Sequence, residues 1–181
     1  IKKGQQILYL LPEISLTTQI IQKLKNYFGN KISVYHSRYS LNERTEVWEN
    51  VKKNKENSQI VIGARSSIFL PFYDLGLIIV DEEHEVSYKQ QEPSPRYNAR
   101  DSAIYLSKIY KTKVILGSAT PSIESAFNAK DGKYGLVEIF ERYGNIQMPL
   151  IRTLDMRTEP KHEFNSIFSK KLVDEINKSV D

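Results

Sequence analysis

The sequence has no cysteine and no long apolar run, and these two absences limit what the chain can be. Without cysteine it can form neither disulfide bonds nor thiolate zinc sites. It has no stretch of 18 apolar residues that would span a membrane, and no signal-peptide pattern. We therefore expect no membrane contact, and a cytoplasmic location fits this composition.

A phosphate-binding loop of the form G-x-x-x-x-G-K-[ST] is also missing. The single Gly-Lys pair, Gly132-Lys133, is followed by Tyr134 and lacks the upstream glycine. Such a loop supplies the backbone N–H groups and the lysine that hold nucleotide phosphates. The 181-residue chain alone is therefore expected to hydrolyse no ATP. Because the sequence begins at Ile1 and ends in a helical pattern, we interpret it as part of a longer protein.

The composition suits one α/β domain with a mild basic bias. The chain has 26 Lys and Arg against 22 Asp and Glu, a formal net charge of +4. This charge permits nucleic-acid binding without requiring it. A domain of this length buries about two-thirds of its unfolded surface, enough for a substantial core.

Strand and helix patterns alternate along the chain. This alternation predicts a parallel sheet with helices on both faces, while the two prolines within residues 92–95 break regular structure. Strands are expected at residues 6–11, 32–35, 60–62, 76–80, 113–117, 135–139 and 150–156, and helices at 16–28, 42–53, 97–110, 122–129 and from 169 onward.

The most informative segment is the apolar run at residues 77–80, which ends at Asp81-Glu82-Glu83-His84. A continuous apolar run fits a strand that is buried on both faces of a parallel sheet. Ligands of open α/β sheets bind just beyond the carboxyl ends of such strands. The acidic residues are therefore well placed to hold a magnesium–nucleotide, although a solvent-exposed acidic turn is an alternative of similar weight from these four residues alone.

Polar residues also follow the other expected strands. Because the carboxyl ends of parallel strands lie along one edge of a sheet, we expect these segments to converge. A single Ser-Ala-Thr would usually be only a helix cap, but four polar strand ends in succession are harder to explain as turns. The three further segments are Pro12-Glu13 with Thr17, Gly63-Ala64-Arg65-Ser66, and Gly117-Ser118-Ala119-Thr120.

These four segments resemble motifs Ia, Ib, II and III of the superfamily-2 helicases. A closer resemblance is to the replication-restart helicases of the bacterial primosome. It extends over nearly the whole chain, includes residues 96–101, and is specific at Ser87-Tyr88-Lys89-Gln90-Gln91-Glu92. The sequence departs from the family at Ala64, where threonine is common, and in the missing phosphate loop.

The resemblance implies a RecA-like helicase lobe at residues 1–156, without its phosphate-loop strand, and a linker and helix toward a second lobe at 157–181. It also implies that the complete protein is an ATP-dependent 3′-to-5′ DNA helicase that uses ATP and Mg²⁺, with zinc bound outside this chain. The implied partners are single-stranded and forked DNA, a single-stranded-DNA-binding protein and other primosome proteins.

The acidic residues have distinct expected roles. Asp81 is suited to hold Mg²⁺ through water, and Glu82 can accept a proton from the attacking water. The resemblance assigns Glu83 and His84 to relaying the nucleotide state to the coupling residues Gly117, Ser118, Ala119 and Thr120. A metal site made of all four residues is a weak alternative, because adjacent side chains of an extended chain point to opposite faces.

DNA contacts are expected from two kinds of residue. Aromatic rings can stack on bases while cations neutralise phosphates. The loop after the acidic segment, residues 88–100, contains both and is therefore typical of single-strand binding. Packing of the loop tyrosines against the domain is the alternative, especially for Tyr97. The expected DNA-binding residues are Pro12, Glu13, Thr17, Arg65, Ser66, Tyr88, Lys89, Gln90, Arg96, Tyr97 and Arg100.

Two other functions stay open: the motor lobe of a restriction-type DNA translocase, and a nucleic-acid-binding module without catalysis. A structural expectation concerns residues 113–117. Without a phosphate-loop strand, this apolar strand has one unpaired edge, and such edges recruit other strands. We expect the C-terminal segment or a second copy of the chain to cover it.

Overall fold

The structure is a computed structural model that describes residues 4–13, 18–141, 144, 149–158 and 168–180. It forms two compact units, Ile1–Leu136 and Val137–Asp181. The boundary expected after residue 156 falls inside the second unit. Five strands and four of the five α-helices lie in the first unit, which also holds the candidate site.

The first unit is built on a parallel sheet of five strands with the order β2-β3-β1-β4-β5. The strands are β1 (Gln6–Leu10), β2 (Ile32–Tyr35), β3 (Ile60–Gly63), β4 (Leu75–Val80) and β5 (Lys113–Leu116). Five of the seven expected strands are thus confirmed, each within one residue of its expected bounds.

The strands expected at residues 135–139 and 150–156 are wrong. Both segments are irregular in the structure. Their apolar side chains are open to solvent: Val137 and Ile139 are each 86% exposed, and Leu150 is 77% exposed. Alternating apolar residues form a strand only where a neighbouring strand accepts their backbone hydrogen bonds, and no such pairing involves these segments.

All expected helices are present, although residues 16 and 17 of the first expected helix lie outside the described residues. They are α1 (Thr18–Phe28), α2 (Leu41–Lys52), α3 (Ala99–Tyr110), α4 (Ile123–Lys130) and α5 (Lys170–Val180). Side chains that accept backbone N–H groups fix several helix starts. Ser40 and Glu43 form a capping box at α2, Asn98 caps α3, and Ser122 caps α4.

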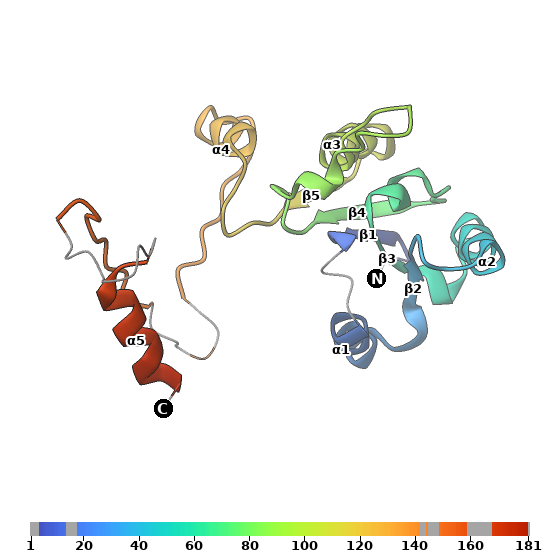
Figure 1. Cartoon of the computed structure of the whole chain (residues 1–181). Coiled ribbons are helices and arrows are strands. Elements are labelled where there is room, and N and C mark those ends of the chain that lie inside the picture. The colour runs from blue at the N-terminus through green and yellow to red at the C-terminus, as the bar shows by residue number, and fades with distance from the viewer. Residues whose placement is uncertain (1–3, 14–17, 142–143, 145–148, 159–167, 181) are drawn as a thin grey trace. The chain divides into compact units, whose positions relative to one another are not determined.

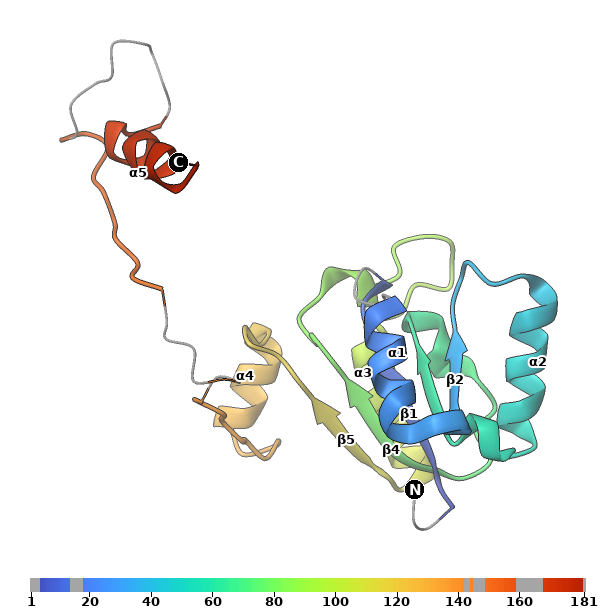
Figure 2. The same cartoon turned by 90° about the horizontal axis from the view of Figure 1, so that it is seen from below.

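Helices cover both faces of the sheet, as Figures 1 and 2 show for α1 and α3 on opposite sides. On one face, Leu8 and Leu10 of β1 pack with Val51 of α2 and Ala103 of α3. The alternate residues of β1 pack with Ile20, Ile21 and Leu24 of α1 on the other face. This is the α/β, RecA-like arrangement that was expected.

The edge strand β5 pairs with β4 alone in the sheet. Its Ile115 is 52% exposed, although the residue is β-branched and apolar. The expected unpaired edge is therefore present in the first unit. Whether a further segment or a second chain covers it stays a prediction.

Backbone hydrogen bonds continue past the ends of the strands and gather the polar segments. The amide of Asp81 donates to the carbonyl of Leu10 at 3.0 Å, and the amide of Gly117 donates to Val80 at 2.9 Å. The amide of Glu83 donates in turn to the carbonyl of Gly117 at 3.0 Å. The acidic segment after β4 is thus held between the ends of β1 and β5.

Candidate nucleotide and DNA site

Asp81 lies at the centre of this edge of the sheet. Its Oδ2 accepts a hydrogen bond from the Tyr9 hydroxyl at 2.8 Å, and its Oδ1 accepts from the Glu82 amide at 3.1 Å. The Tyr88 hydroxyl donates to the Asp81 backbone carbonyl at 2.7 Å. The side chain and the backbone of Asp81 are therefore both held in place by neighbouring groups.

Glu82 follows in a left-handed backbone conformation, with φ of 47°. A residue other than glycine adopts this conformation at a cost of roughly 1 to 3 kcal/mol, and such strain concentrates at functional sites. The Glu82 side chain is 45% exposed, and its Oε2 lies 3.6 Å from His84 Nδ1. Glu82 is thus open to an approaching water, in contrast to the buried Glu83.

Glu83 points the other way and is 3% exposed. It accepts hydrogen bonds from the Ser122 amide at 2.7 Å, the Ser125 hydroxyl at 2.9 Å and the Arg100 guanidinium at 3.1 Å. Burial alone would raise the pKa of Glu83, but these donors outweigh it and hold the pKa below its ordinary value. Glu83 ties the end of β4 to α3 and α4.

His84 links the acidic segment to the segment after β5. Its Nδ1 lies 2.7 Å from the Ser118 hydroxyl, and its Nε2 lies 3.3 Å from the Thr120 hydroxyl. The amide of Thr120 also donates to the Ser118 hydroxyl. The expected relay residue and two of the expected coupling residues are therefore in direct contact, while Ala119 makes no such bond that the structure describes.

The segment after β1 contributes little exposed surface to the site. Pro12 is almost completely buried, and Glu13 is exposed with its Oε1 3.5 Å from the Ser37 hydroxyl. Thr17, the third expected DNA contact of this segment, lies outside the described residues.

Arg65 connects the segment after β3 to the loop after the acidic segment. It begins a short 3-10 helix, η4 (Arg65–Phe69), beside the half-buried Ser66. Its Nη1 donates weakly to the backbone carbonyls of Ser87 at 3.4 Å and Lys89 at 3.5 Å. Because these bonds are long, the guanidinium stays partly available to a phosphate.

The loop after the acidic segment is closed at its base. Lys89 and Asn98 form an antiparallel bridge, and the amide of Gln90 donates to Tyr97 at 2.8 Å. The Gln90 side chain donates inward to Pro93 and Pro95. Lys89 and Arg96 are exposed, and the side chain of Arg96, 70% exposed, lies at a long distance of 3.9 Å from Glu92.

Besides the buried Pro12, two further residues expected to bind DNA lie inside the fold instead. Tyr88 is 1% exposed and belongs to the core between the sheet and α3. The side chain of Arg100 is 11% exposed and pairs with Glu83 at 3.1 Å and Asp101 at 2.8 Å. These positions argue against base stacking by Tyr88 and against phosphate binding by Arg100, because both groups already have partners in the protein.

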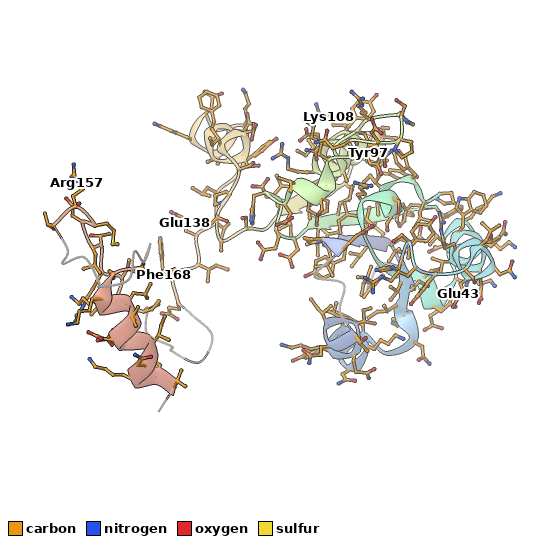
Figure 3. All side chains as sticks on the ribbon, in the orientation of Figure 1. Glu43, Tyr97, Lys108, Glu138, Arg157 and Phe168 are labelled. Atoms are coloured by element: carbon orange, nitrogen blue, oxygen red, sulfur yellow. The ribbon has the colours of Figure 1, made fainter. Side chains whose placement is uncertain are left out.

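Tyr97, which Figure 3 labels, forms an aromatic pair with Phe69, a residue that the sequence analysis did not predict to bind DNA. Phe69 at the end of η4 is 62% exposed, and its ring meets that of Tyr97 edge to face with centroids 4.8 Å apart. A groove of about 420 Å³ runs from this pair along α3 to Tyr105. Phe69 lies three residues after Ser66, so its aromatic side chain close to the expected DNA-binding segment was the available signal.

The site fits a Mg²⁺ ion only if phosphates supply most of its ligands. In the part of the chain that the structure describes, no three His, Asp or Glu side chains converge on a metal position. Mg²⁺ is commonly bound by one or two carboxylates together with substrate phosphates and water, and the Asp81 carboxylate matches that donor set. None of the described helices is long and apolar enough to cross a membrane.

Comparison with known proteins gives the relatives of this chain. It is 40% identical to the replication restart protein PriA of Bacillus subtilis over 178 residues, 98% of this chain and 22% of that protein. Identity to PriA of Rickettsia typhi is 45% over 96% of this chain and 26% of that protein, and to PriA of Haemophilus influenzae 47% over 80% and 20%. The chain thus spans about a quarter of the length of these relatives.

Among solved structures, the C-terminal domain of S. cerevisiae Dbp5 is similar with a TM-score of 0.46 and 15% identity, over 72% of this chain and 71% of that one. A similarity at this level identifies no function. The model of the DEAD/DEAH box helicase family matches residues 1–128, which include β1 to β5, the acidic segment and residues 117–120 after β5. The chain belongs to the DEAD/DEAH box helicase family, and its curated relatives are PriA replication restart proteins.

Proposed function

We propose that this chain is part of the motor of an ATP-dependent 3′-to-5′ DNA helicase that acts in replication restart. The observation that carries the proposal is the contact of His84 with Ser118 and Thr120. It joins the acidic segment, where a nucleotide would be hydrolysed, to a second segment that can respond to hydrolysis. The similarity to PriA proteins supports the role in replication restart.

In this proposal Asp81 holds Mg²⁺ through water, and the metal supplies charge neutralisation at the phosphates when nucleotide is bound. Glu82 accepts the proton of the attacking water, since its side chain is 45% exposed. His84 then passes the change at Glu82 to Ser118 and Thr120. Glu83 takes no part in proton transfer, because its oxygens are occupied by Ser122, Ser125 and Arg100.

We further propose that single-stranded DNA, including that of forks, runs over the loop after the acidic segment and η4. Lys89, Arg96 and Arg65 supply positive charge there, and Phe69 with Tyr97 supplies aromatic surface. A cytoplasmic location, ATP as the nucleotide, and contacts with a single-stranded-DNA-binding protein and other primosome proteins belong to the same proposal. Zinc is expected only outside this chain.

The test uses the full-length product of the gene. ATP hydrolysis is measured with and without single-stranded DNA, and strand separation is measured on forks with a 3′ or a 5′ single-stranded tail. We expect DNA-stimulated hydrolysis and 3′-to-5′ polarity, both abolished in Asp81→Asn. DNA binding without hydrolysis would indicate a binding module. Hydrolysis with movement along duplex DNA but no strand separation would indicate a restriction-type translocase.

A further inference from the structure

Tyr9 contacts the proposed metal-binding carboxylate, that of Asp81. The sequence does not predict this contact, because Tyr9 belongs to none of the four motif segments. Its hydroxyl donates to Asp81 Oδ2 at 2.8 Å. Tyr9 is the last residue but one of β1, before the Pro12-Glu13 segment, and the Asp81 carboxylate follows β4. The contact therefore exists only because β1 and β4 are neighbours in the sheet.

The register of the two strands explains the contact. Leu10 of β1 is paired with Val80 of β4, and both side chains are buried on the α3 face of the sheet. Side chains alternate between faces along a strand. Tyr9, one residue before Leu10, and Asp81, one residue after Val80, therefore lie diagonally on the opposite face, at a separation that a tyrosine side chain can bridge.

Two hydrogen bonds fix the orientation of the Asp81 carboxylate and leave its β5 side uncovered. Oδ2 is held by Tyr9, and Oδ1 accepts the Glu82 amide, so rotation of the carboxylate would break both bonds. On the β5 side the neighbour is Gly117, where a Cβ would lie 3.5 Å from Oδ1. The absence of a side chain at Gly117 leaves this side of the carboxylate open.

The Tyr9 hydroxyl is a neutral group that donates a hydrogen bond to the Asp81 carboxylate. A neutral phenol beside a carboxylate orients it without adding a positive charge that would compete with a metal ion. Lysine or arginine at this position would instead form an ion pair and repel Mg²⁺.

We propose that Tyr9 is a positioning residue for the metal-binding step, holding the Asp81 carboxylate in the orientation that Mg²⁺ with its nucleotide requires. This inference rests on the proposed function, because it assumes a magnesium–nucleotide at Asp81. Removing a residue that hydrogen-bonds to a metal ligand and orients it typically lowers metal affinity or activity about 10- to 100-fold.

The experiment compares wild type, Tyr9→Phe and Tyr110→Phe in the full-length protein. Tyr110→Phe is the matched control, because it removes a tyrosine hydroxyl that also donates at 2.8 Å, to the Phe72 carbonyl away from the site. Binding of a fluorescent ADP analogue is titrated with Mg²⁺ and repeated in EDTA. For Tyr9→Phe we expect the Mg²⁺ concentration at half-saturation to rise about tenfold, with unchanged affinity in EDTA. Tyr110→Phe should keep the wild-type Mg²⁺ dependence.

Two results would overturn the inference: a wild-type Mg²⁺ dependence in Tyr9→Phe, or an equal loss of affinity with and without Mg²⁺. The second result would show that Tyr9 only stabilises the fold. If wild type itself binds no nucleotide at any Mg²⁺ concentration, the proposed function fails together with this inference, and that outcome is distinct from both of the others.

Discussion

At the scale of single residues, the turn after β4 gives neighbouring acidic residues different roles. Asp81 still follows the alternation of the strand and faces Tyr9. The left-handed conformation of Glu82 then redirects the chain, so that Glu82 is half-exposed and Glu83 is buried against Arg100. One run of carboxylates thus contains an expected metal ligand, an expected base and a structural anchor.

Replacement of the anchor should be seen in stability and in its pH dependence. Glu83→Gln leaves the buried Arg100 without its closest buried partner, and we expect a loss of about 3 kcal/mol of unfolding free energy at pH 7. The folded pKa of Glu83 lies below its ordinary value of 4.5. Its stabilisation is therefore complete above that value and is lost as the pH falls through the folded pKa.

Urea denaturation of the 181-residue chain at several pH values measures this effect. The difference between wild type and Glu83→Gln should be constant from pH 7 to about pH 5.5 and shrink below about pH 4. Glu124→Gln is the control, since Glu124 is 71% exposed and lies 4.0 Å from the same Arg100. A difference between wild type and Glu83→Gln that stays constant down to pH 3 would exclude Glu83 as the titrating group.

The sequence was sufficient to locate the acidic segment but not to separate inward from outward side chains near it. Tyr88 and Arg100 belong to an alternation of aromatic and basic residues that is typical of DNA-binding loops. Their partners, the Asp81 carbonyl and the Glu83 carboxylate, approach them only after the chain has folded. Local composition cannot report such contacts, whereas the exposed Phe69 could have been found from its position three residues after Ser66.

At the scale of elements, the loop after the acidic segment is a closed unit with an exposed tip. The bridge between Lys89 and Asn98 holds its base, and the inward bonds of Gln90 hold its interior. Such a loop can present Lys89 and Arg96 to a phosphate backbone without unfolding. The two prolines predicted the irregular backbone, but the bridge at its base needed the structure.

A double substitution tests the role of this loop. In the full-length protein, Lys89→Ala with Arg96→Ala should weaken single-stranded-DNA binding and reduce the slope of its salt dependence, because two phosphate contacts are lost. DNA stimulation of ATP hydrolysis should fall in parallel. Lys130→Ala, an exposed lysine at the end of α4, is the control. Unchanged DNA affinity at low salt in the double variant would place the DNA path elsewhere.

The edge strand β5 gives a prediction about association. Its unpaired edge and the exposed Ile115 should recruit another strand. We expect the 181-residue chain to self-associate in sedimentation experiments, with slow amide exchange at residues 113–116, and Ile115→Lys to reduce the association. A monomer in which one edge of β5 exchanges freely would contradict this expectation.

The alternating pattern of strands and helices was enough to predict five strands and the covered faces of the sheet. It failed at residues 135–139 and 150–156, where apolar residues such as Val137 and Leu150 are exposed and have no pairing partner. Strand formation depends on a neighbour, and periodicity alone does not supply one.

At the scale of the whole molecule, the chain contains part of what nucleotide hydrolysis requires. It carries the acidic and coupling segments but no phosphate-binding loop. The purified 181-residue chain should therefore hydrolyse ATP at the background rate, with or without single-stranded DNA, because no backbone cradle and lysine hold the phosphates. A phosphate-release assay measures this, with Asp81→Asn as the background control. DNA-stimulated turnover that disappears in Asp81→Asn would show that another group holds the phosphates.

The central claim is that the segment after β4 is the hydrolytic centre of a DNA-dependent motor, and Glu82→Gln in the full-length protein tests it most directly. Steady-state hydrolysis is measured with saturating single-stranded DNA, and nucleotide affinity is measured separately, with Glu85→Gln as the matched control. We predict wild-type nucleotide affinity and a kcat lowered at least about 100-fold in Glu82→Gln, because general-base catalysis contributes about 10²- to 10⁴-fold. Wild-type turnover in Glu82→Gln would contradict the account.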